Sequence, residues 1–252
     1  MHTMKKLTFP DIVPDAEVVS RLRSASTRVT IVTDDMAEPR DMAEYKEKYE
    51  NLGVVGSGTF GSVYCAKEKE SEEYVASKYM IMETKKVVAE AEILKDLIMS
   101  AFIPQLLGVY HGPLHNVLVT EFLAGGDLVT RTADDGYSLT ERKCQIFIRQ
   151  IVRGLQYIHG QRIIHLDLKP FNIMFSNPDD DYNLRIIDFG LSERLPSDKD
   201  RVAMTMCGTL EFMCPEVMDC KFCSTASDMW GLGSIAYLLL SGGVSPFWGG
   251  NR

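Results

Sequence analysis

The sequence has no long uncharged apolar run. Its longest apolar stretch, Trp230 to Leu240, falls well short of the roughly 20 residues that a helix needs to cross a bilayer. The N-terminus is charged and lacks the apolar core of a signal peptide. We therefore expect a soluble, cytoplasmic protein with no membrane partner.

Positive charge is also scarce. The chain carries 27 Lys and Arg against 35 Asp and Glu, a net charge of −8. A protein that binds nucleic acid regardless of sequence needs a basic surface to displace counterions from the phosphates. The composition therefore disfavours a nucleic-acid partner.

Cysteine is too sparse for a disulfide scaffold, with six residues in 252. Four of them cluster: Cys207, Cys214, Cys220 and Cys223. The last two have a spacing that zinc sites use, but no second closely spaced pair completes a four-ligand cage. We favour small apolar residues on a packed segment over a zinc site.

Residues 1–44 differ from the rest of the chain. Charges and prolines interrupt every periodic run, and only Val29–Val32 resembles a strand. We interpret 1–44 as a polar extension, a linker or a piece of something upstream, and 45–252 as the folded domain.

From Tyr49 the pattern becomes regular. It predicts strands over 49–55, 62–67, 74–80 and 117–122, and helices over about 87–98 and 140–159. Either Ser138 or Thr140 could cap the second helix. A strand-rich front and a helix-rich back, joined at Gly125-Gly126, suggest two lobes with a cleft.

The first chemical motif is Gly56-Ser57-Gly58-Thr59-Phe60-Gly61. Glycines let the backbone approach a polyphosphate and aim its N–H groups at the oxygens. A strand through Val63 follows, where a dinucleotide-binding turn would continue as a helix.

A strand lysine is the second motif. Lys78 in Val75-Ala76-Ser77-Lys78 can neutralise phosphate oxygens if a partner fixes its long side chain. Glu90, on the next predicted helix, is the candidate partner. The alternative is that both residues are ordinary solvated charges.

Two further motifs supply polar side chains after apolar strands: His165-Leu166-Asp167-Leu168-Lys169-Pro170-Phe171-Asn172 and Ile186-Ile187-Asp188-Phe189-Gly190. Asparagine and aspartate oxygens suit Mg²⁺. Asp167 could accept a hydroxyl proton, and Lys169 could balance charge on a transferring phosphoryl group.

Together and in this order, the motifs resemble those of eukaryotic protein kinases. Lys169-Pro170 resembles the serine/threonine kinases. The stretches 121–128, 208–212 and 245–247 resemble the calcium/calmodulin-type branch, closest to myosin light-chain kinases and to twitchin, titin and obscurin kinases. The resemblance covers about residues 49–252.

This resemblance implies an α+β, two-lobed kinase fold, with a small β-rich N-lobe carrying one main helix (about 45–124) and a helical C-lobe (about 125–252). It implies Mg²⁺ and ATP as cofactors, with Asp167 as catalytic base, Lys169 steadying the γ-phosphate, and Asn172 and Asp188 holding the metal. The implied nucleotide contacts are Gly56, Ser57, Gly58, Thr59, Phe60, Gly61, Val63, Ala76, Lys78, Glu90, Thr120, Glu121, Leu123, Asp127 and Met174. Asp228 is expected to brace the catalytic loop, and His165 and Phe189 to pack together.

The sequence departs from the kinase pattern in several places. Leu166 replaces an arginine that normally pairs with a phosphate on the activation segment, so we expect activity without phosphorylation of Thr205 or Thr209. Phe171 replaces a common glutamate, which puts a simple basic-substrate preference in doubt. Cys214 replaces the alanine of Ala-Pro-Glu.

The chain also ends before the last helices of the kinase pattern, and we interpret it as C-terminally truncated. Leu239, Phe247 and Trp248 are then candidates for exposure.

The function implied is transfer of the ATP γ-phosphoryl group to a protein serine or threonine hydroxyl, in a cytoskeletal or sarcomeric setting in muscle. Calmodulin or a cytoskeletal protein could be a further partner, although no segment for it is visible. A kinase-like scaffold or mechanical element is the alternative. A small-molecule phosphotransferase fits less well, because it should lack the peptide-docking segment 208–216.

Overall fold

The computed structural model describes residues 36–58, 61–81, 84–134, 136–203 and 206–247. The described residues form two compact units, one of those up to Ala91 with Leu106–Ala124 and one of Glu92–Gln105 with those from Gly125 onward. Among the residues described, no helix is both long and apolar enough to cross a bilayer.

A six-stranded sheet forms the first unit, with strand order β1-β5-β6-β4-β3-β2. β1 runs parallel to β5, and the other neighbours are antiparallel. The strands are β1 (Pro39–Asp41), β2 (Tyr49–Gly58), β3 (Gly61–Glu68), β4 (Tyr74–Met80), β5 (Leu106–His111) and β6 (Asn116–Glu121). The strands expected from sequence are therefore confirmed, whereas β1 and β5 are additional.

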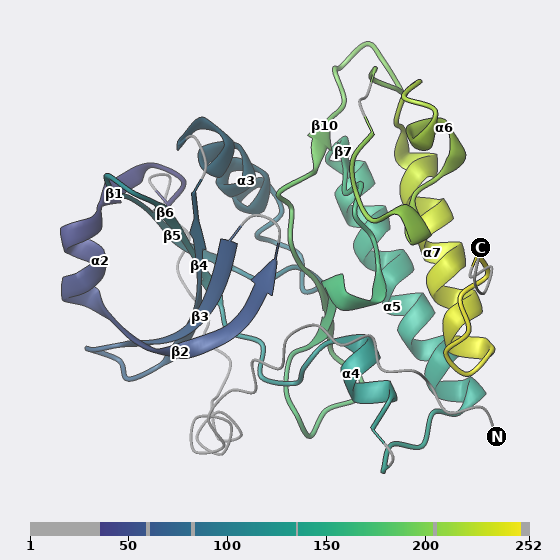
Figure 1. The fold of residues 1–252 in the computed structure, drawn as a ribbon, viewed down its shortest axis with the longest axis horizontal. Coiled ribbons are helices and arrows are strands. Elements are labelled where there is room, and N and C mark those ends of the chain that lie inside the picture. Colours follow the sequence, from purple (N-terminus) through teal and green to yellow (C-terminus); the bar gives the residue numbers. More distant parts are fainter. Residues whose placement is uncertain (1–35, 59–60, 82–83, 135, 204–205, 248–252) are drawn as a thin grey trace. The chain divides into compact units, whose positions relative to one another are not determined.

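Each face of the sheet is covered by a helix, and Figure 1 shows α2 (Met42–Lys48) on one side and α3 (Thr84–Asp96) on the other. Side chains alternate along a strand. Val75 and Ser77 of β4 are accordingly buried on the α2 face, where Val75 packs with Tyr45 of that helix. Lys78 points to the other face, where it meets α3.

The structure differs from the sequence expectation between residues 36 and 44. β1 joins the sheet edge, Asp41 caps α2 through its carboxylate, and Met42 is buried against the sheet. These residues belong to the folded unit, because their apolar side chains cover one face of the sheet. The Val29–Val32 prediction lies outside the described residues.

A second difference concerns the division near residue 91. The end of α3 and the chain to Gln105 cluster with the second unit. The backbone explains this in part, since Phe102 O accepts a hydrogen bond of 2.8 Å from Ile186 N.

Helices dominate the second unit. They are α4 (Leu128–Thr132), α5 (Glu141–Gly160), α6 (Pro215–Met218) and α7 (Thr225–Leu240). Short strands pair as β8 (Ile173–Phe175) with β9 (Leu184–Ile186), and as β7 (Ile163–Ile164) with β10 (Glu193–Arg194). The expected helix over 140–159 is confirmed, and Thr140 is its cap, with its side chain accepting from Lys143 N.

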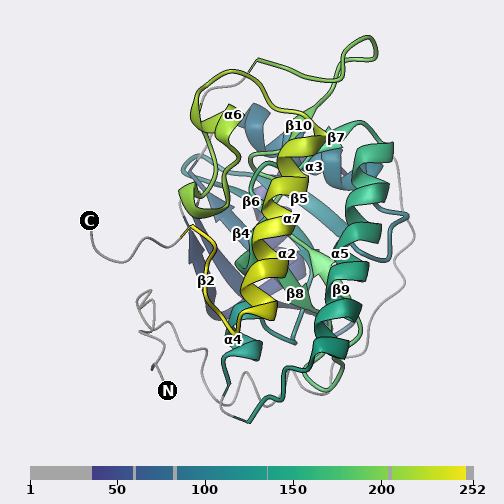
Figure 2. The same cartoon turned by 90° about the vertical axis from the view of Figure 1, so that its right-hand side faces the viewer.

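Helices α5 and α7 lie side by side (Figure 2), and the Cys144 thiol of α5 reaches Leu239 O of α7 at 3.8 Å. The expectation that Leu239 is exposed is wrong, because α5 covers it and only 3% of it is accessible. Phe247 is exposed as expected and stacks on Trp230, with ring centroids 5.2 Å apart. Trp248 lies outside the described residues.

The clustered cysteines have different surroundings. Cys214 and Cys223 are buried in one apolar cluster, Cys207 is half-buried, and Cys220 is exposed. Burial raises the pKa of Cys223 to about 11 and also raises the pKa of Cys214. Cys214 and Cys223 are thus packed apolar side chains, the reading favoured from sequence.

Candidate active site

The described part of the expected phosphate loop lies at the turn between β2 and β3 and comprises Gly56, Ser57, Gly58 and Gly61. Residues 59–60 lie outside the described part of the chain. Gly61 has φ 146°, and a Cβ there would lie 1.8 Å from Tyr79 O, so only glycine fits. At Gly56 an added Cβ would make ordinary contact with Val63, at 3.8 Å.

Lys78 and Glu90 form an ion pair inside the first unit. The Nζ of Lys78 lies 2.8 Å from Oε1 and 3.2 Å from Oε2 of Glu90, and the carboxylate is 5% exposed. Glu92 is exposed. The choice of Glu90 as partner is therefore confirmed, and the pair fixes the ammonium group beside the strand.

Three of the expected nucleotide contacts share the Lys78 face of the sheet. Val63 lies directly opposite Lys78, and Ala76 lies opposite Thr120. Opposed residues of antiparallel strands point to the same face, and so do residues two apart on one strand. Glu121 is the last residue of β6 and Leu123 lies two positions beyond it, so both follow Thr120 closely where this surface ends.

Asp127 and Met174 lie together in the second unit, where they form an isolated backbone bridge. The Asp127 carboxylate caps α4, with Oδ1 2.9 Å from both Val129 N and Thr130 N. A capping role for this side chain was not expected from the sequence.

The loop after β7 gathers polar groups around the Asp167 carboxylate, which is 8% exposed. Oδ2 lies 2.6 Å from Lys169 Nζ and accepts from Asn172 Nδ2 at 3.0 Å. Oδ1 accepts from the Thr209 backbone N–H at 3.1 Å and from its hydroxyl at 2.9 Å. The carboxylate is thereby held in a single orientation.

Asn172 and Asp188 come from neighbouring pieces of backbone, because Ile187 N donates to Asn172 O at 2.9 Å. The Asn172 amide nitrogen donates to Asp167 O and Oδ2, which leaves the amide oxygen as its potential metal ligand. Asp188 has φ 65°, a left-handed conformation that costs energy for a residue with a side chain. Such strain is typical of functional positions.

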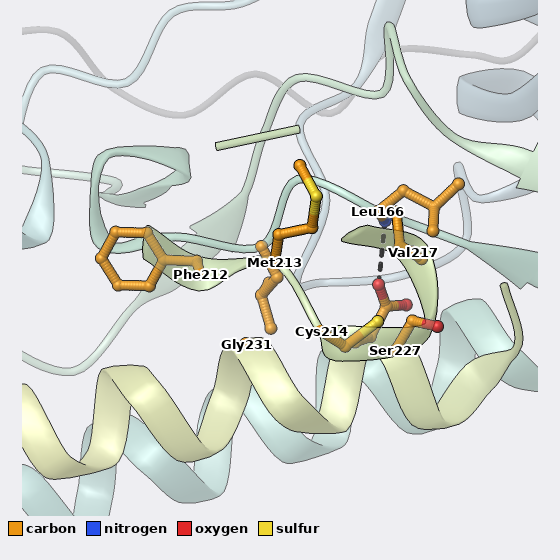
Figure 3. A pocket seen from close by; sticks show the side chains of 9 residues that line it. Leu166, Phe212, Met213, Cys214, Val217, Ser227 and Gly231 are labelled. Atoms are coloured by element: carbon orange, nitrogen blue, oxygen red, sulfur yellow. Dashed lines mark hydrogen bonds between the residues drawn. The ribbon is translucent and has the colours of Figure 1, made fainter. Parts of the chain in front are cut away.

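Asp228 of α7 supports the catalytic loop, residues 165–172, as expected. Its Oδ2 accepts from His165 N at 2.9 Å. Its Oδ1 accepts from Leu166 N, also at 2.9 Å, and Figure 3 marks this second bond. The loop also passes very close to Gly231, where an added Cβ would lie 2.8 Å from Leu168 O. The expected packing of His165 on Phe189 is confirmed, with ring centroids 5.0 Å apart.

Sequence reasoning missed two residues of this network. The Thr209 hydroxyl bonds to Asp167 and accepts from Lys169 Nζ at 2.9 Å. His159 Nε2 lies 2.7 Å from Asp228 Oδ2. Thr209 follows Gly208 in a motif that was noted only for docking and phosphorylation. His159 has no signal in the sequence, because its partner is 69 residues away.

Leu166 adopts φ 66° and packs against a buried apolar cluster, most of which comes from residues 195–223. The members of this cluster are Ile164, Leu195, Met213, Cys214, Val217 and Cys223. Val202 also packs on it and exchanges two backbone hydrogen bonds with Cys223. Apolar contacts hold the segment at the position where the kinase pattern has an arginine. Independence from phosphorylation stays a prediction, and Thr205 lies outside the described residues.

A family model described as "Protein kinase domain" matches residues 49–252. The chain belongs to the protein kinase family. Its relatives include a rabbit (Oryctolagus cuniculus) myosin light chain kinase 2, 40% identical over 201 residues, which are 78% of this chain and 32% of the relative. Human myosin light chain kinase family member 4 is 33% identical, over 96% of this kinase chain and 65% of its own length.

Solved kinase structures resemble the chain as well. A Caenorhabditis elegans twitchin kinase fragment is 32% identical with a TM-score of 0.71, covering 81% of this chain and 46% of its own. Titin kinase with its flanking domains is 27% identical with a TM-score of 0.75, covering 94% and 43%. The expected two-lobed α+β kinase fold is confirmed. The chain spans a third or less of the length of the first myosin light chain kinases it matches.

Proposed function

We propose that this chain is a serine/threonine protein kinase, which transfers the γ-phosphoryl group of Mg²⁺-bound ATP to a hydroxyl of a protein. The observation that carries the proposal is the Asp167 carboxylate, buried and held by Lys169, Asn172 and Thr209 within hydrogen-bonding distance. A scaffold with no chemistry would have no need for four polar side chains oriented on one another.

The first unit suits a nucleotide. The Lys78–Glu90 pair offers a fixed positive charge for phosphate oxygens, and the glycine turn lets backbone N–H groups come close to them. The adjoining surface on the same face of the sheet is formed by small side chains, those of Val63, Ala76 and Thr120. We propose that these residues, with Gly56, Ser57, Gly58, Glu121 and Leu123, bind ATP.

The second unit suits the metal and the reacting hydroxyl. Asn172 and Asp188 offer the oxygen ligands that Mg²⁺ prefers. When bound, Mg²⁺-ATP supplies the phosphoryl group and a cation that offsets its charge. Asp167 orients the substrate hydroxyl and accepts its proton, and Lys169 offsets negative charge on the transferring group.

The substrate class follows from the family. The relatives are named as kinases of myosin light chains, and several names specify skeletal, cardiac or smooth muscle. We propose a protein substrate in the cytoplasm of muscle for this chain too. Calmodulin or a cytoskeletal partner stays a hypothesis. Phe171, half-buried beside the catalytic loop, leaves no acid at that position to receive a basic substrate residue.

The test is phosphotransfer from labelled ATP to a mixed peptide library, comparing the native chain with Asp167→Asn. The asparagine keeps the shape of the side chain but cannot take a proton, so we expect the rate to fall by about 10²- to 10⁴-fold. Asp198→Asn, on an exposed loop, is the matched control and should keep the native rate.

A binding measurement with a non-hydrolysable ATP analogue should give similar affinities for the native chain and Asp167→Asn. Equal, background-level phosphotransfer in all three proteins would contradict the proposal and favour the scaffold alternative.

A further inference from the structure

Tyr45 of helix α2 packs against the face of the first unit's sheet that lies opposite Lys78. Tyr45 is 2% exposed, and its ring packs against Tyr49, Tyr79 and Tyr110 with centroid distances of 5.2, 5.9 and 5.4 Å. Its hydroxyl lies 2.6 Å from Asn51 Oδ1 and 2.9 Å from Ser77 Oγ.

The direction of these hydrogen bonds follows from chemistry. An amide oxygen can only accept, so the single phenol proton goes to Asn51 and the Ser77 hydroxyl donates in return. Ser77 is fully buried, and burial keeps the phenol protonated by raising the pKa of Tyr45. A second bond, from Asn51 Nδ2 to Tyr79 OH at 2.8 Å, joins the same elements.

The two strands tied in this way are not neighbours. Asn51 belongs to β2 and Ser77 to β4, and β3 lies between them in the sheet. The network passes over β3 at Ala66, which lies opposite Asn51 and belongs to the same buried cluster. Its small side chain leaves room for the bridging hydroxyl.

β2 is an edge strand of the sheet and pairs with β3 alone. The β2–β3 register shifts twice, between Asn51 and Gly53 and again between Val54 and Gly56. Such irregularities interrupt the ladder and bend the strand. The side-chain tie therefore anchors β2 just before the stretch that leads to the glycine turn.

We infer that Tyr45 is a positioning residue for the nucleotide site, holding the strand of the glycine turn in place relative to the strand of Lys78. The inference rests on the proposed ATP site, because β2 carries Gly56 and Gly58 and β4 carries the lysine. Ser77 and Lys78 are adjacent and face opposite sides of the sheet, so the tie acts from the side that ATP does not occupy.

The experiment compares Tyr45→Phe with Tyr110→Phe in the full chain. Each variant loses one phenol hydroxyl from the same buried cluster. Of these two hydroxyls, that of Tyr45 joins β2 to β4 through Asn51 and Ser77, whereas Tyr110 lies on β5. We expect Tyr45→Phe to raise the Kd for a non-hydrolysable Mg²⁺-ATP analogue, and the KM for ATP, by about three- to tenfold, the worth of roughly one hydrogen bond. The KM for peptide should not change.

Ser77→Ala should reproduce the effect, and adding it to Tyr45→Phe should weaken binding little further. Tyr110→Phe should change ATP affinity less than twofold, even if it lowers the melting temperature as much as Tyr45→Phe does. Equal effects of the two tyrosine variants on ATP affinity would overturn the positioning role.

Hydrogen exchange without nucleotide tests the tie independently of ATP. Tyr45→Phe should speed exchange at the glycine end of β2 and in β4, while β5 and β6 keep the native rates. Unchanged exchange there would overturn the inference. If the native chain bound no ATP analogue, the proposed function would fail, and the exchange measurement would still decide whether the tie exists.

Discussion

Two glycines of α7 offer a sharp test of how the catalytic loop is supported. Gly231 is buried, and a Cβ there would lie 2.8 Å from Leu168 O and 3.2 Å from Leu168 Cβ. Gly233, two residues on, is exposed and would meet nothing within 4 Å. The same substitution in the same helix should therefore have opposite consequences.

The magnitudes follow from helix propensity and packing. Replacing an exposed helical glycine by alanine stabilises by about 0.8–1 kcal/mol, so Gly233→Ala should gain about that amount. Gly231→Ala makes the same gain but must displace a backbone carbonyl, an overpacking cost of about 1–3 kcal/mol or more. Because that carbonyl belongs to the loop of Asp167, its displacement should also slow phosphotransfer by about 100-fold.

Thermal unfolding followed by circular dichroism measures the first effect. At roughly 2–4 °C per kcal/mol for a chain of this size, Gly233→Ala should melt about 2–4 °C higher. Gly231→Ala should melt lower than Gly233→Ala by roughly 2–12 °C. If Gly231→Ala were as stable and as active as Gly233→Ala, α7 would not support the loop by direct contact.

Two more predictions concern Thr209 and the cysteines. Thr209→Val should lower kcat by about 10- to 100-fold because it removes hydrogen bonds to charged groups, whereas Thr209→Ser should stay near the native rate. Equal rates for the valine and serine variants would show that the hydroxyl is dispensable. Loss of activity in Thr209→Val would not by itself show that Thr209 must be phosphorylated, because the unmodified hydroxyl already bonds to Asp167. Iodoacetamide at pH 8 should modify exposed Cys220 within minutes, while Cys223, whose pKa burial raises to about 11, reacts only on unfolding. Peptide mass spectrometry measures both rates, and early modification of Cys223 would contradict its burial.

Local pattern in the sequence was enough for the strands and for the choice of chemical groups. Alternation gives β4 its bounds, Tyr74–Met80, in agreement with the structure. Asp167, Lys169 and Asn172 lie within six positions of one another, so a single turn of chain brings them together. Lys78 lies on a predicted strand and Glu90 on the next predicted helix, and the resemblance to kinases implied their pairing.

Contacts between distant residues were decided only by the tertiary structure. Thr209 reaches Asp167 across 42 positions, and His159 reaches Asp228 across 69. Periodicity indicates which side of an element is buried, but it does not indicate which polar group of a distant segment will contact that side. Residues 36–44 were assigned to a polar extension because charges and Pro39 interrupt any periodic pattern there. Only the sheet face that buries Met42 shows that they belong to the folded unit.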